Sequence, residues 1–321
     1  MHCIPLLKYC LDKKHSKKCT IIKENQTAFC PFCFFEDTTN FCFSKQDLSE
    51  ISQNKLHQTI IDNISSICTN LVPGHQEDCH EFFINFLNSL EAQYLKIEKC
   101  QEKDSLINQI FGGIIKSELE CCVCSNKLYT YENFKDLSLE IEENCSIQKS
   151  LDKYCEVEKL VGFNKFFCSV CNMKTETLKR YEFFKLPHIL SIHLKRFNNS
   201  FTKVKTRIDI ESEIQLKGIG KKWNKIIDQS YSLFGIIDHY GRSLEGGHFI
   251  AKVRSWKGVW IQYNNLIVSN TKLALNKNPY TYMLFYKIKK ESEINSDSNL
   301  IINKKRHNIV ILNRNCIRKQ V

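Results

Sequence analysis

The residues best suited to chemistry are a histidine behind two glycines, Gly246-Gly247-His248, and a pair of asparagines, Asn264-Asn265. Apolar and polar residues alternate around the glycines, so we expect two strands that flank a polar turn, with His248 where the turn passes into the second strand. A histidine that acts as a general base needs a neighbour that accepts its Nδ1 proton, and the amide oxygen of Asn264 is suited to this task. The glycines, which lack a Cβ, allow another chain to approach the imidazole closely. Taken alone, each pattern is more typical of a surface turn.

A second chemistry, metal binding, is carried by cysteine pairs with the spacing Cys-x2-Cys. Cys121 and Cys124 form one pair, and Cys168 and Cys171 form the other. Each pair places two thiolates on one tight turn, and four thiolates complete a tetrahedron around zinc. The sequence therefore predicts a structural zinc site, with no open coordination position, at the tips of β-ribbons. Cys122 is expected to be a bystander.

An earlier cluster has ligand types and spacings that also suit zinc: His15, Cys19, Cys30 and Cys33. The alternative is a set of small buried thiols, because free cysteine behaves as a small apolar residue. Pair spacing does not separate these two interpretations.

Asp78 and Glu81 begin a predicted amphipathic helix, in which Phe82, Phe86 and Leu90 repeat at every fourth position. An Asp followed three residues later by a Glu is typical of a capping box, which satisfies free backbone donors at a helix start. The functional alternative is an acidic pair that binds a basic peptide. Both can hold at once.

Composition limits the class of protein. A chain of 321 residues with 42% hydrophobic side chains can form one large or two modest globular domains. Its 17 cysteines are not spaced as an extracellular disulfide framework, so we expect a reduced, intracellular protein of the cytoplasm or nucleus. The sequence contains no run approaching the ~18 apolar residues of a membrane helix, so we expect no membrane partner. The formal charge of +11 favours acidic partners without specifying a fold.

Taken in order, six motifs resemble the ubiquitin-specific protease family of cysteine deubiquitinases: QEDCHEFF, CVC, CSVC, LPHILSIHLKRF, EGGHFIAKV and WIQYNNLIV. The resemblance runs from about Met1 to Tyr286, and TYMLFYKI at residues 281–288 looks like the family's last strand. Each motif alone is weak, but six in the family's order are specific.

The resemblance implies an α+β, papain-like fold shaped as a right hand within a catalytic-type domain at residues 1–288. A helical thumb would span residues 1–110, zinc-bearing β fingers 111–185 and a β palm 186–288, followed by a basic tail at 289–321. The fingers would hold ubiquitin, and its C-terminal tail would pass between thumb and palm.

The family's functional residues carry over by position. The resemblance implies that His248 is the catalytic histidine, that Asn264 is the third triad member, and that Asp78 and Glu81 meet the arginines of the ubiquitin tail. Gly246 and Gly247 would line a narrow channel for the tail's glycines. The two Cys-x2-Cys pairs would bind structural zinc, with no cofactor needed for catalysis, and the earlier His/Cys cluster resembles an insertion found in one subgroup.

Two departures affect the nucleophile and the second polar position, Asn265, which follows Asn264. The family's cysteine lies in a Gly-Asn-Thr-Cys box on the first thumb helix, and no such box occurs in this sequence. We expect the chain to begin just downstream of it, with a thumb truncated at its N-terminus, and Cys3 and Cys10 to be poor replacements because they lack that context. Asn265 stands where the family usually has aspartate, which leaves it an auxiliary role at most.

Three functions follow as hypotheses. The first is a deubiquitinase acting on ubiquitin and ubiquitinated proteins by Cys-His-Asn chemistry. The second is an inactive relative that binds ubiquitin without cleaving it, although retention of His248 and Asn264 favours the first. The third is a basic zinc-ribbon protein that binds nucleic acid. Its lysines are dispersed, so nucleic acid is expected to bind only through basic residues of the tail such as Lys304, Lys305 and Arg306.

Overall fold

The structure is a computed structural model that describes residues 3–21, 28–43, 58–68, 70–71, 74–143, 145–197, 203–219, 226–243, 246–265 and 267–289. These residues divide into two compact units, Cys3–Ile107 and Asn108–Lys289. The boundaries predicted for thumb, fingers and palm stay predictions. The basic tail lies outside the described residues from position 290 onward, and its contact with nucleic acid stays a prediction.

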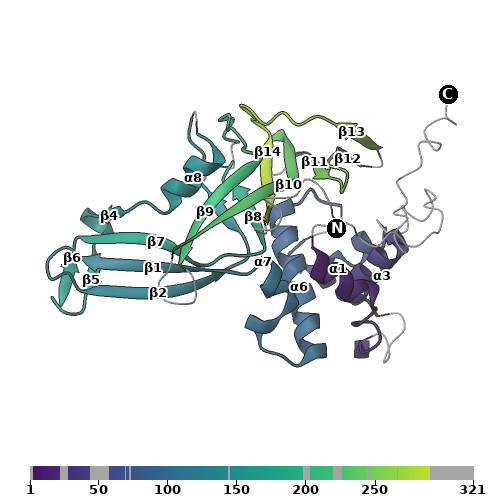
Figure 1. Cartoon of the computed structure of the whole chain (residues 1–321), viewed down its shortest axis with the longest axis horizontal. Helices are drawn as coiled ribbons and strands as arrows, with labels where there is room; N and C mark the ends of the chain where they lie inside the picture. The colour runs from purple at the N-terminus through teal and green to yellow at the C-terminus, as the bar shows by residue number, and fades with distance from the viewer. Residues whose placement is uncertain are drawn as a thin grey trace. The chain divides into compact units, whose positions relative to one another are not determined.

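The first unit is helical (Figure 1). Its helices are α1 (Ile4–Leu11), α3 (Pro31–Phe43), α5 (Ile64–Ile67), α6 (Cys79–Glu98) and the short η1 (Glu102–Asp104), and α7 (Leu106–Phe111) spans the boundary between the units. Aromatic rings join α1, α3 and α6, since the Tyr9 ring lies 5.5 Å from Phe32 and 5.3 Å from Tyr94, measured between centroids. Such ring pairs add roughly 0.5–1.5 kcal/mol each beyond the area that they bury.

The second unit is built on one branched sheet. Its strands and the helices between them are β1 (Gly113–Cys121), β2 (Lys127–Phe134), β3 (Leu137–Leu139), α8 (Ile147–Tyr154), β4 (Glu158–Leu160), η2 (Gly162–Asn164), β7 (Thr177–Lys185), β8 (Ile189–Leu194), β9 (Glu213–Ile219), β10 (Ile226–Ser243), β11 (Gly246–Arg254), β12 (Trp260–Asn264), β13 (Ile267–Thr271) and β14 (Thr281–Ile288). The main path runs β13-β12-β11-β10-β9-β7-β1-β2, and β14 joins β10 to β8. A separate hairpin pairs β5 (Phe166–Cys168) with β6 (Met173–Thr175).

The motif LPHILSIHLKRF at residues 186–197 contains a central strand, β8. β8 pairs with β14 on one side and with β3 on the other. Leu190, Ile192 and Leu194 are fully buried, and so is Ser191 between them, so both faces of the strand are covered for most of its length. Leu190, Ile192 and Leu194 belong to the apolar core of the second unit, together with Leu284 and Tyr286 of β14.

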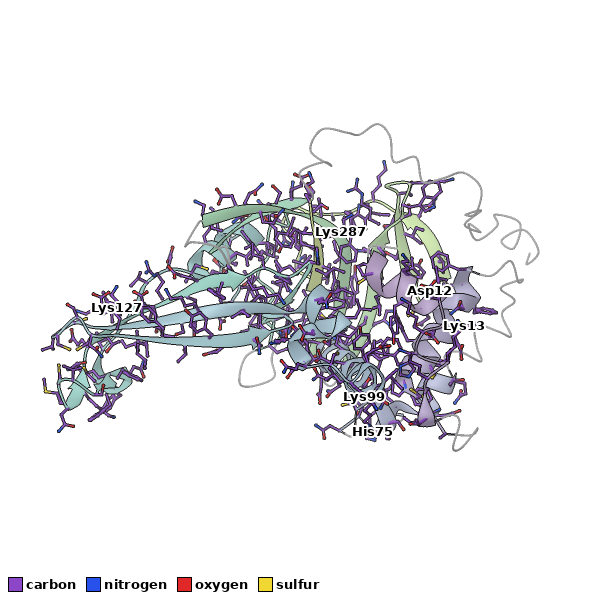
Figure 2. All side chains as sticks on the ribbon, turned by 60° about the horizontal axis from the view of Figure 1, so that its bottom comes forward. Asp12, Lys13, His75, Lys99, Lys127 and Lys287 are labelled. Atoms are coloured by element: carbon purple, nitrogen blue, oxygen red, sulfur yellow. The ribbon has the colours of Figure 1, made fainter. Side chains whose placement is uncertain are left out.

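The strands β1, β2 and β7 form a long antiparallel ribbon, with β5 and β6 beyond its end (Figure 1). Glu118 of β1 is buried in this ribbon and accepts ion pairs from Lys127 at 2.9 Å, Arg180 at 3.4 Å and Lys116 at 3.5 Å. Figure 2 shows Lys127 near the end of the ribbon that lies beside β5 and β6. Among the described residues, no helix is both long and apolar enough to cross a membrane.

Candidate active site and metal centres

The sheet brings His248 and Asn264 into direct contact. The pairs Ala251–Tyr263 and Lys252–Gln262 align β11 with β12, which puts Asn264 diagonally across from His248. The Nε2 atom of His248 lies 2.5 Å from the Oδ1 atom of Asn264, and both side chains are half-buried. An amide oxygen can only accept, so Nε2 donates and the ring's lone pair is on Nδ1.

This contact corrects one expectation. The sequence interpretation assigned the Asn264 bond to Nδ1, whereas the structure makes it through Nε2. The physical reason is reach: Nε2 is the ring nitrogen further from the main chain, and a diagonal partner on the next strand requires the longer arm. The correction reverses the roles of the two nitrogens, so Nδ1 is the atom able to take a proton from a substrate or a thiol.

Asn265 has a structural explanation. Asn264 pairs with Ile267 across β12 and β13, and Asn265 stands in the tight turn between these strands with φ 52°. That left-handed backbone is unfavourable for most residues, but asparagine tolerates it. The turn interpretation of this motif is therefore correct at Asn265, while Asn264 faces the histidine.

Asp78 caps α6 as predicted. Its Oδ1 atom accepts hydrogen bonds from the backbone N–H groups of His80 at 2.7 Å and Glu81 at 2.9 Å. Glu81 lies in the first turn of the helix, where a negative charge is favourable. Capping is thus established by geometry, and a role of either carboxylate in binding a peptide stays a prediction.

The two Cys-x2-Cys pairs converge on one point at the end of the ribbon. The ligand atoms of Cys121, Cys124, Cys168 and Cys171 all lie within 4.8 Å of one another. The Sγ atoms are 3.9 Å apart for Cys121 and Cys171 and 3.6 Å apart for Cys124 and Cys168. Tetrahedral zinc with bonds of about 2.3 Å requires sulfur separations of about 3.8 Å, so the four residues fit zinc.

The surroundings also favour a thiolate at this cluster. The Thr175 hydroxyl lies 3.2 Å from the Cys121 sulfur, and the backbone N–H of Val123 donates to the same sulfur at 3.4 Å. Hydrogen bonds from Thr175, the largest contributor, and from the backbone N–H groups of Cys124 and Val123 lower the pKa of Cys121 to about 6. Sequence reasoning missed Thr175, although a threonine four residues after the second Cys pair is a visible signal for a hydroxyl beside the metal.

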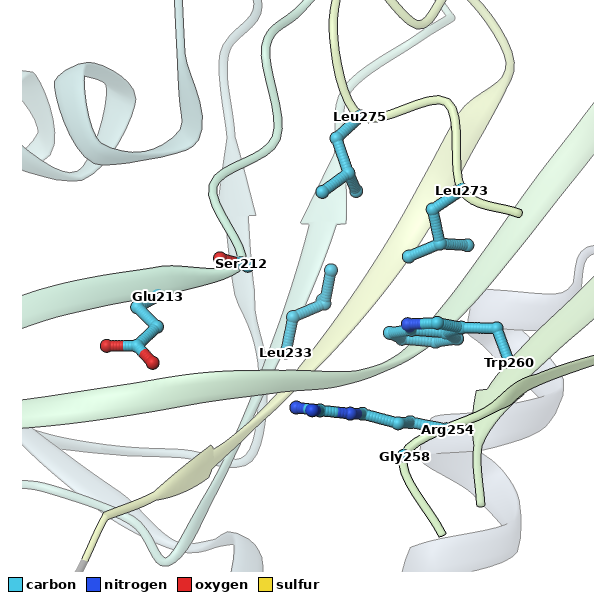
Figure 3. Close-up of a pocket in the computed structure, with 8 residues that line it drawn as sticks. All are labelled: Ser212, Glu213, Leu233, Arg254, Gly258, Trp260, Leu273 and Leu275. Atoms are coloured by element: carbon cyan, nitrogen blue, oxygen red, sulfur yellow. The ribbon is translucent and has the colours of Figure 1, made fainter. Parts of the chain in front are cut away.

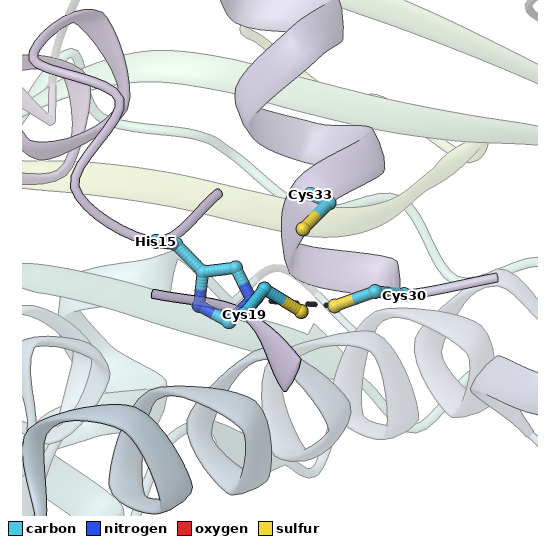
Figure 4. Close-up of side chains that lie close together, drawn as sticks. All are labelled: His15, Cys19, Cys30 and Cys33. Carbon is cyan, nitrogen blue, oxygen red and sulfur yellow. Dashed lines mark hydrogen bonds between the residues drawn. The ribbon is translucent and has the colours of Figure 1, made fainter. Parts of the chain in front are cut away.

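The earlier cluster converges as well (Figure 4). His15, Cys19, Cys30 and Cys33 are all buried, with ligand atoms within 4.8 Å of one another. The Nε2 atom of His15 lies 3.3 Å from the Cys30 sulfur, close to the roughly 3.6 Å that tetrahedral zinc sets between a nitrogen and a sulfur ligand. The donor set and its geometry therefore fit zinc, and sequence spacing alone did not distinguish this from buried thiols.

A buried carboxylate fixes the loop that carries His15. Glu36 of α3 accepts from the backbone N–H of His15 at 3.1 Å and of Ser16 at 2.9 Å. The His15 ring stacks on Phe32 with centroids 4.5 Å apart. Within the described residues His15 Nδ1 has no hydrogen-bond partner, so the ring is oriented by packing and by its cysteine neighbours.

Neither Cys3 nor Cys10 has the character of a catalytic thiol. Burial raises the pKa of both thiols to about 12, which disfavours the thiolate at neutral pH. This agrees with the expectation that they are poor replacements for a nucleophile.

The second unit also contains a small pocket of about 260 Å³ (Figure 3). Leu233, Leu273, Leu275 and Trp260 supply its apolar wall, and Glu213 and Arg254 supply charge. None of its lining residues is His248, Asn264 or a metal-ligand candidate, so the pocket is separate from the histidine site.

Comparison with known proteins agrees with this geometry. The sequence profile of the family "Ubiquitin carboxyl-terminal hydrolase" matches residues 1–286. The chain is 31% identical over 291 residues to ubiquitin carboxyl-terminal hydrolase 25 of Arabidopsis thaliana, covering 88% of this chain and 43% of that protein. It is 28% identical over 318 residues to a probable ubiquitin carboxyl-terminal hydrolase 16 of Schizosaccharomyces pombe, covering 95% and 67%.

Among solved structures, the chain is similar to a SAGA DUB module containing Ubp8 bound to monoubiquitin. The TM-score is 0.76 at 25% identity, and the match covers 89% of this chain and 64% of that chain. This similarity confirms the expected α+β fold. The chain spans less than half the length of the Arabidopsis relative.

Proposed function

Because the chain belongs to the ubiquitin carboxyl-terminal hydrolase family, we propose that it carries the base and its orienting amide for cysteine-type cleavage of the bond after the terminal glycine of ubiquitin. The observation that supports this most is the 2.5 Å contact between His248 Nε2 and Asn264 Oδ1. The contact gives a defined tautomer to a half-buried histidine. Family membership does not favour the alternative of a nucleic-acid-binding zinc ribbon.

In the proposed mechanism, His248 Nδ1 accepts the proton of the nucleophilic thiol, and the thiolate attacks the glycine carbonyl. The resulting imidazolium stays oriented because Nε2–H continues to donate to Asn264. His248 then returns its proton to the departing lysine amine, leaving a thioester. A water molecule, deprotonated by the same Nδ1 atom, hydrolyses the thioester and releases ubiquitin and the thiol.

Substrate recognition is proposed for Asp78 and Glu81, with Gly246 and Gly247 beside the path of the ubiquitin tail. One carboxylate at the N-cap of α6 and another in its first turn are chemically suited to arginine side chains, because arginine binds carboxylates in a forked geometry.

Both metal clusters are proposed to hold structural zinc. Four protein ligands close the coordination sphere in each, so the metal would stabilise the fold and leave no position for a substrate. A reducing compartment keeps thiolate ligands and a thiol nucleophile free of disulfides, which supports an intracellular location for the proposed activity.

The test has two arms. In the first, ubiquitin is titrated into residues 1–321 and binding is measured by calorimetry. In the second, the natural protein, purified from its source cells, is treated with ubiquitin bearing a C-terminal electrophile and then assayed for cleavage. We expect binding in the first arm and covalent capture in the second, with cleavage abolished by His248→Ala and retained in His188→Ala, an exposed histidine chosen as the control. Binding without capture would show an inactive ubiquitin binder, and absence of both would refute the proposal.

A further inference from the structure

A second histidine lies directly behind the candidate active site. In the β10–β11 pair, His248 is opposite Tyr240, and Gly247 is opposite Gly241. Side chains alternate along a strand, so His239 and Gly247 share the face of the sheet that His248 does not use. His239 is only 1% exposed.

The His239 ring occupies the space in which a side chain at Gly247 would otherwise lie. It is also one of the obstacles at Gly241, where the Gly246 carbonyl oxygen is closer, 2.4 Å from an added Cβ. A Cβ atom added to Gly247 would be 2.1 Å from His239 Nε2, and one added to Gly241 would be 2.8 Å from His239 Cε1. Both separations are far below an ordinary carbon contact of about 3.5–4.0 Å. Gly247 is therefore required by the chain's own packing, independently of any need to admit a ubiquitin tail.

The ring is held from its other side. Lys203 Nζ lies 3.2 Å from His239 Nδ1 and also donates to the His239 carbonyl oxygen. Because an ammonium group can only donate, Nδ1 accepts, and the ring proton is on Nε2, the atom that faces Gly247. Phe249 and Tyr282 pack against the ring with centroids 4.7 and 6.2 Å away, respectively.

We propose that His239 is a positioning residue for His248: its imidazole, fixed by Lys203, supports the main chain at Gly247 and so sets the distance from His248 to Asn264. His239 lies on the opposite face of the strand pair and acts only through the backbone. The consequence for cleavage rests on the proposed function. The packing itself does not, and it can be tested separately.

The first experiment is a double-mutant cycle on stability. Gly247→Ala should be strongly destabilising in the wild-type chain, because of the 2.1 Å overlap, and nearly neutral once His239→Ala has removed the obstacle. Gly235→Ala is the matched control, since its added Cβ would meet Phe285 at 3.3 Å and should cost the same in both backgrounds. Additive costs for Gly247→Ala and His239→Ala would overturn the packing argument.

The second experiment reads His248 directly. Nitrogen NMR of residues 1–321, labelled at histidine, should show one His248 tautomer with the proton on Nε2. We expect His239→Ala to replace this signal with an average of both tautomers, and His239→Gln, which keeps an acceptor for Lys203, to restore most of it. An unchanged His248 signal in a folded His239→Ala variant would refute the positioning role; if that variant does not fold, an unchanged signal in Gly247→Ala would refute it equally.

The third measurement separates this proposal from the proposed function. If the natural protein cleaves ubiquitin, His239→Ala should lower kcat at least tenfold with KM nearly unchanged, because the substrate does not touch His239. An unchanged kcat would overturn the positioning role. If the protein does not cleave ubiquitin, the proposed function fails, while the double-mutant cycle and the His248 tautomer still decide the role of His239.

Discussion

Asp78 offers a test that separates folding from substrate recognition, because one carboxylate is assigned to both. Its Oδ1 atom accepts from the backbone N–H groups of His80 and Glu81. Asparagine caps a helix about as well as aspartate but carries no charge, whereas alanine provides neither cap nor charge. The pair Asp78→Asn and Asp78→Ala therefore removes the two functions in steps.

The magnitudes follow from the geometry. Asp78→Ala should lower the free energy of unfolding by roughly 1–2 kcal/mol, since both backbone donors lose their acceptor. Asp78→Asn keeps the cap and loses only the favourable charge at the helix start, which is worth about 0.3–1 kcal/mol. If Asp78 binds an arginine of the ubiquitin tail, either variant loses about 1.5–3 kcal/mol of binding free energy, or roughly 10–100-fold in Kd.

Two measurements on residues 1–321 decide the matter: urea denaturation for stability and calorimetry for ubiquitin affinity. Ser146→Ala is the control, because Ser146 caps α8 by accepting from Lys149 N–H at 3.3 Å and is not assigned to substrate binding. It should reduce stability and leave Kd unchanged. A ubiquitin affinity of Asp78→Asn equal to that of wild type would refute the binding role and leave Asp78 as a helix cap only.

Three further predictions concern the second unit. Cys124→Ser should release about one zinc equivalent to a chelating dye and lower the free energy of unfolding. Cys122→Ser, which alters a bystander, should do neither, and equal zinc content in both variants would contradict the assignment. Burial tends to raise the pKa of Glu118, but its bonds to Lys127 and the charges of Arg180 and Lys116 lower it overall. A lowered carboxylate pKa stabilises the fold above the ordinary value of 4.5, so Glu118→Gln should cost roughly 1.5–3 kcal/mol at pH 7, and the difference from wild type in urea denaturation should shrink as pH falls below 4.5. A difference independent of pH would contradict it. Arg196 is fully buried and donates to the carbonyl oxygens of Thr206 at 2.8 Å and Asn278 at 3.1 Å. Arg196→Lys should therefore lower the free energy of unfolding, measured by urea denaturation, by about 3 kcal/mol or more. A loss under 1 kcal/mol would show that a lysine ammonium can replace the forked guanidinium.

What the sequence predicts well depends on short-range patterns. The Cys-x2-Cys pairs and the cap at Asp78 are each specified by residues a few positions apart, and the structure contains both. The contact of His248 with Asn264 was also predicted, because a histidine that acts as a base needs an acceptor and the amide oxygen of Asn264 is suited to this task.

What the sequence did not predict depends on cross-strand register. Which nitrogen of His248 meets Asn264 follows from a diagonal placement that no local pattern encodes. Similarly, glycine is required at position 247 because of His239 on the neighbouring strand. Arg196 donates hydrogen bonds to four backbone carbonyl oxygens, and these belong to segments that are far apart in the chain. Such features become visible only once strand pairing is known.

The pairing of β8 with β14 also dictates an order of assembly during synthesis. Ile192 is synthesised long before Leu284, its partner on β14, and both side chains are fully buried in the completed core. All strands of the ribbon that carries the Cys121, Cys124, Cys168 and Cys171 cluster, by contrast, have been synthesised by Lys185. On the ribosome the ribbon can therefore form while the core still lacks its last strand, since contacts distant in sequence form late. A premature stop between Asn264 and Thr281 would leave His248 and Asn264 translated but without the strand that completes their platform, and would expose unpaired edges of β8 and β10 to aggregation.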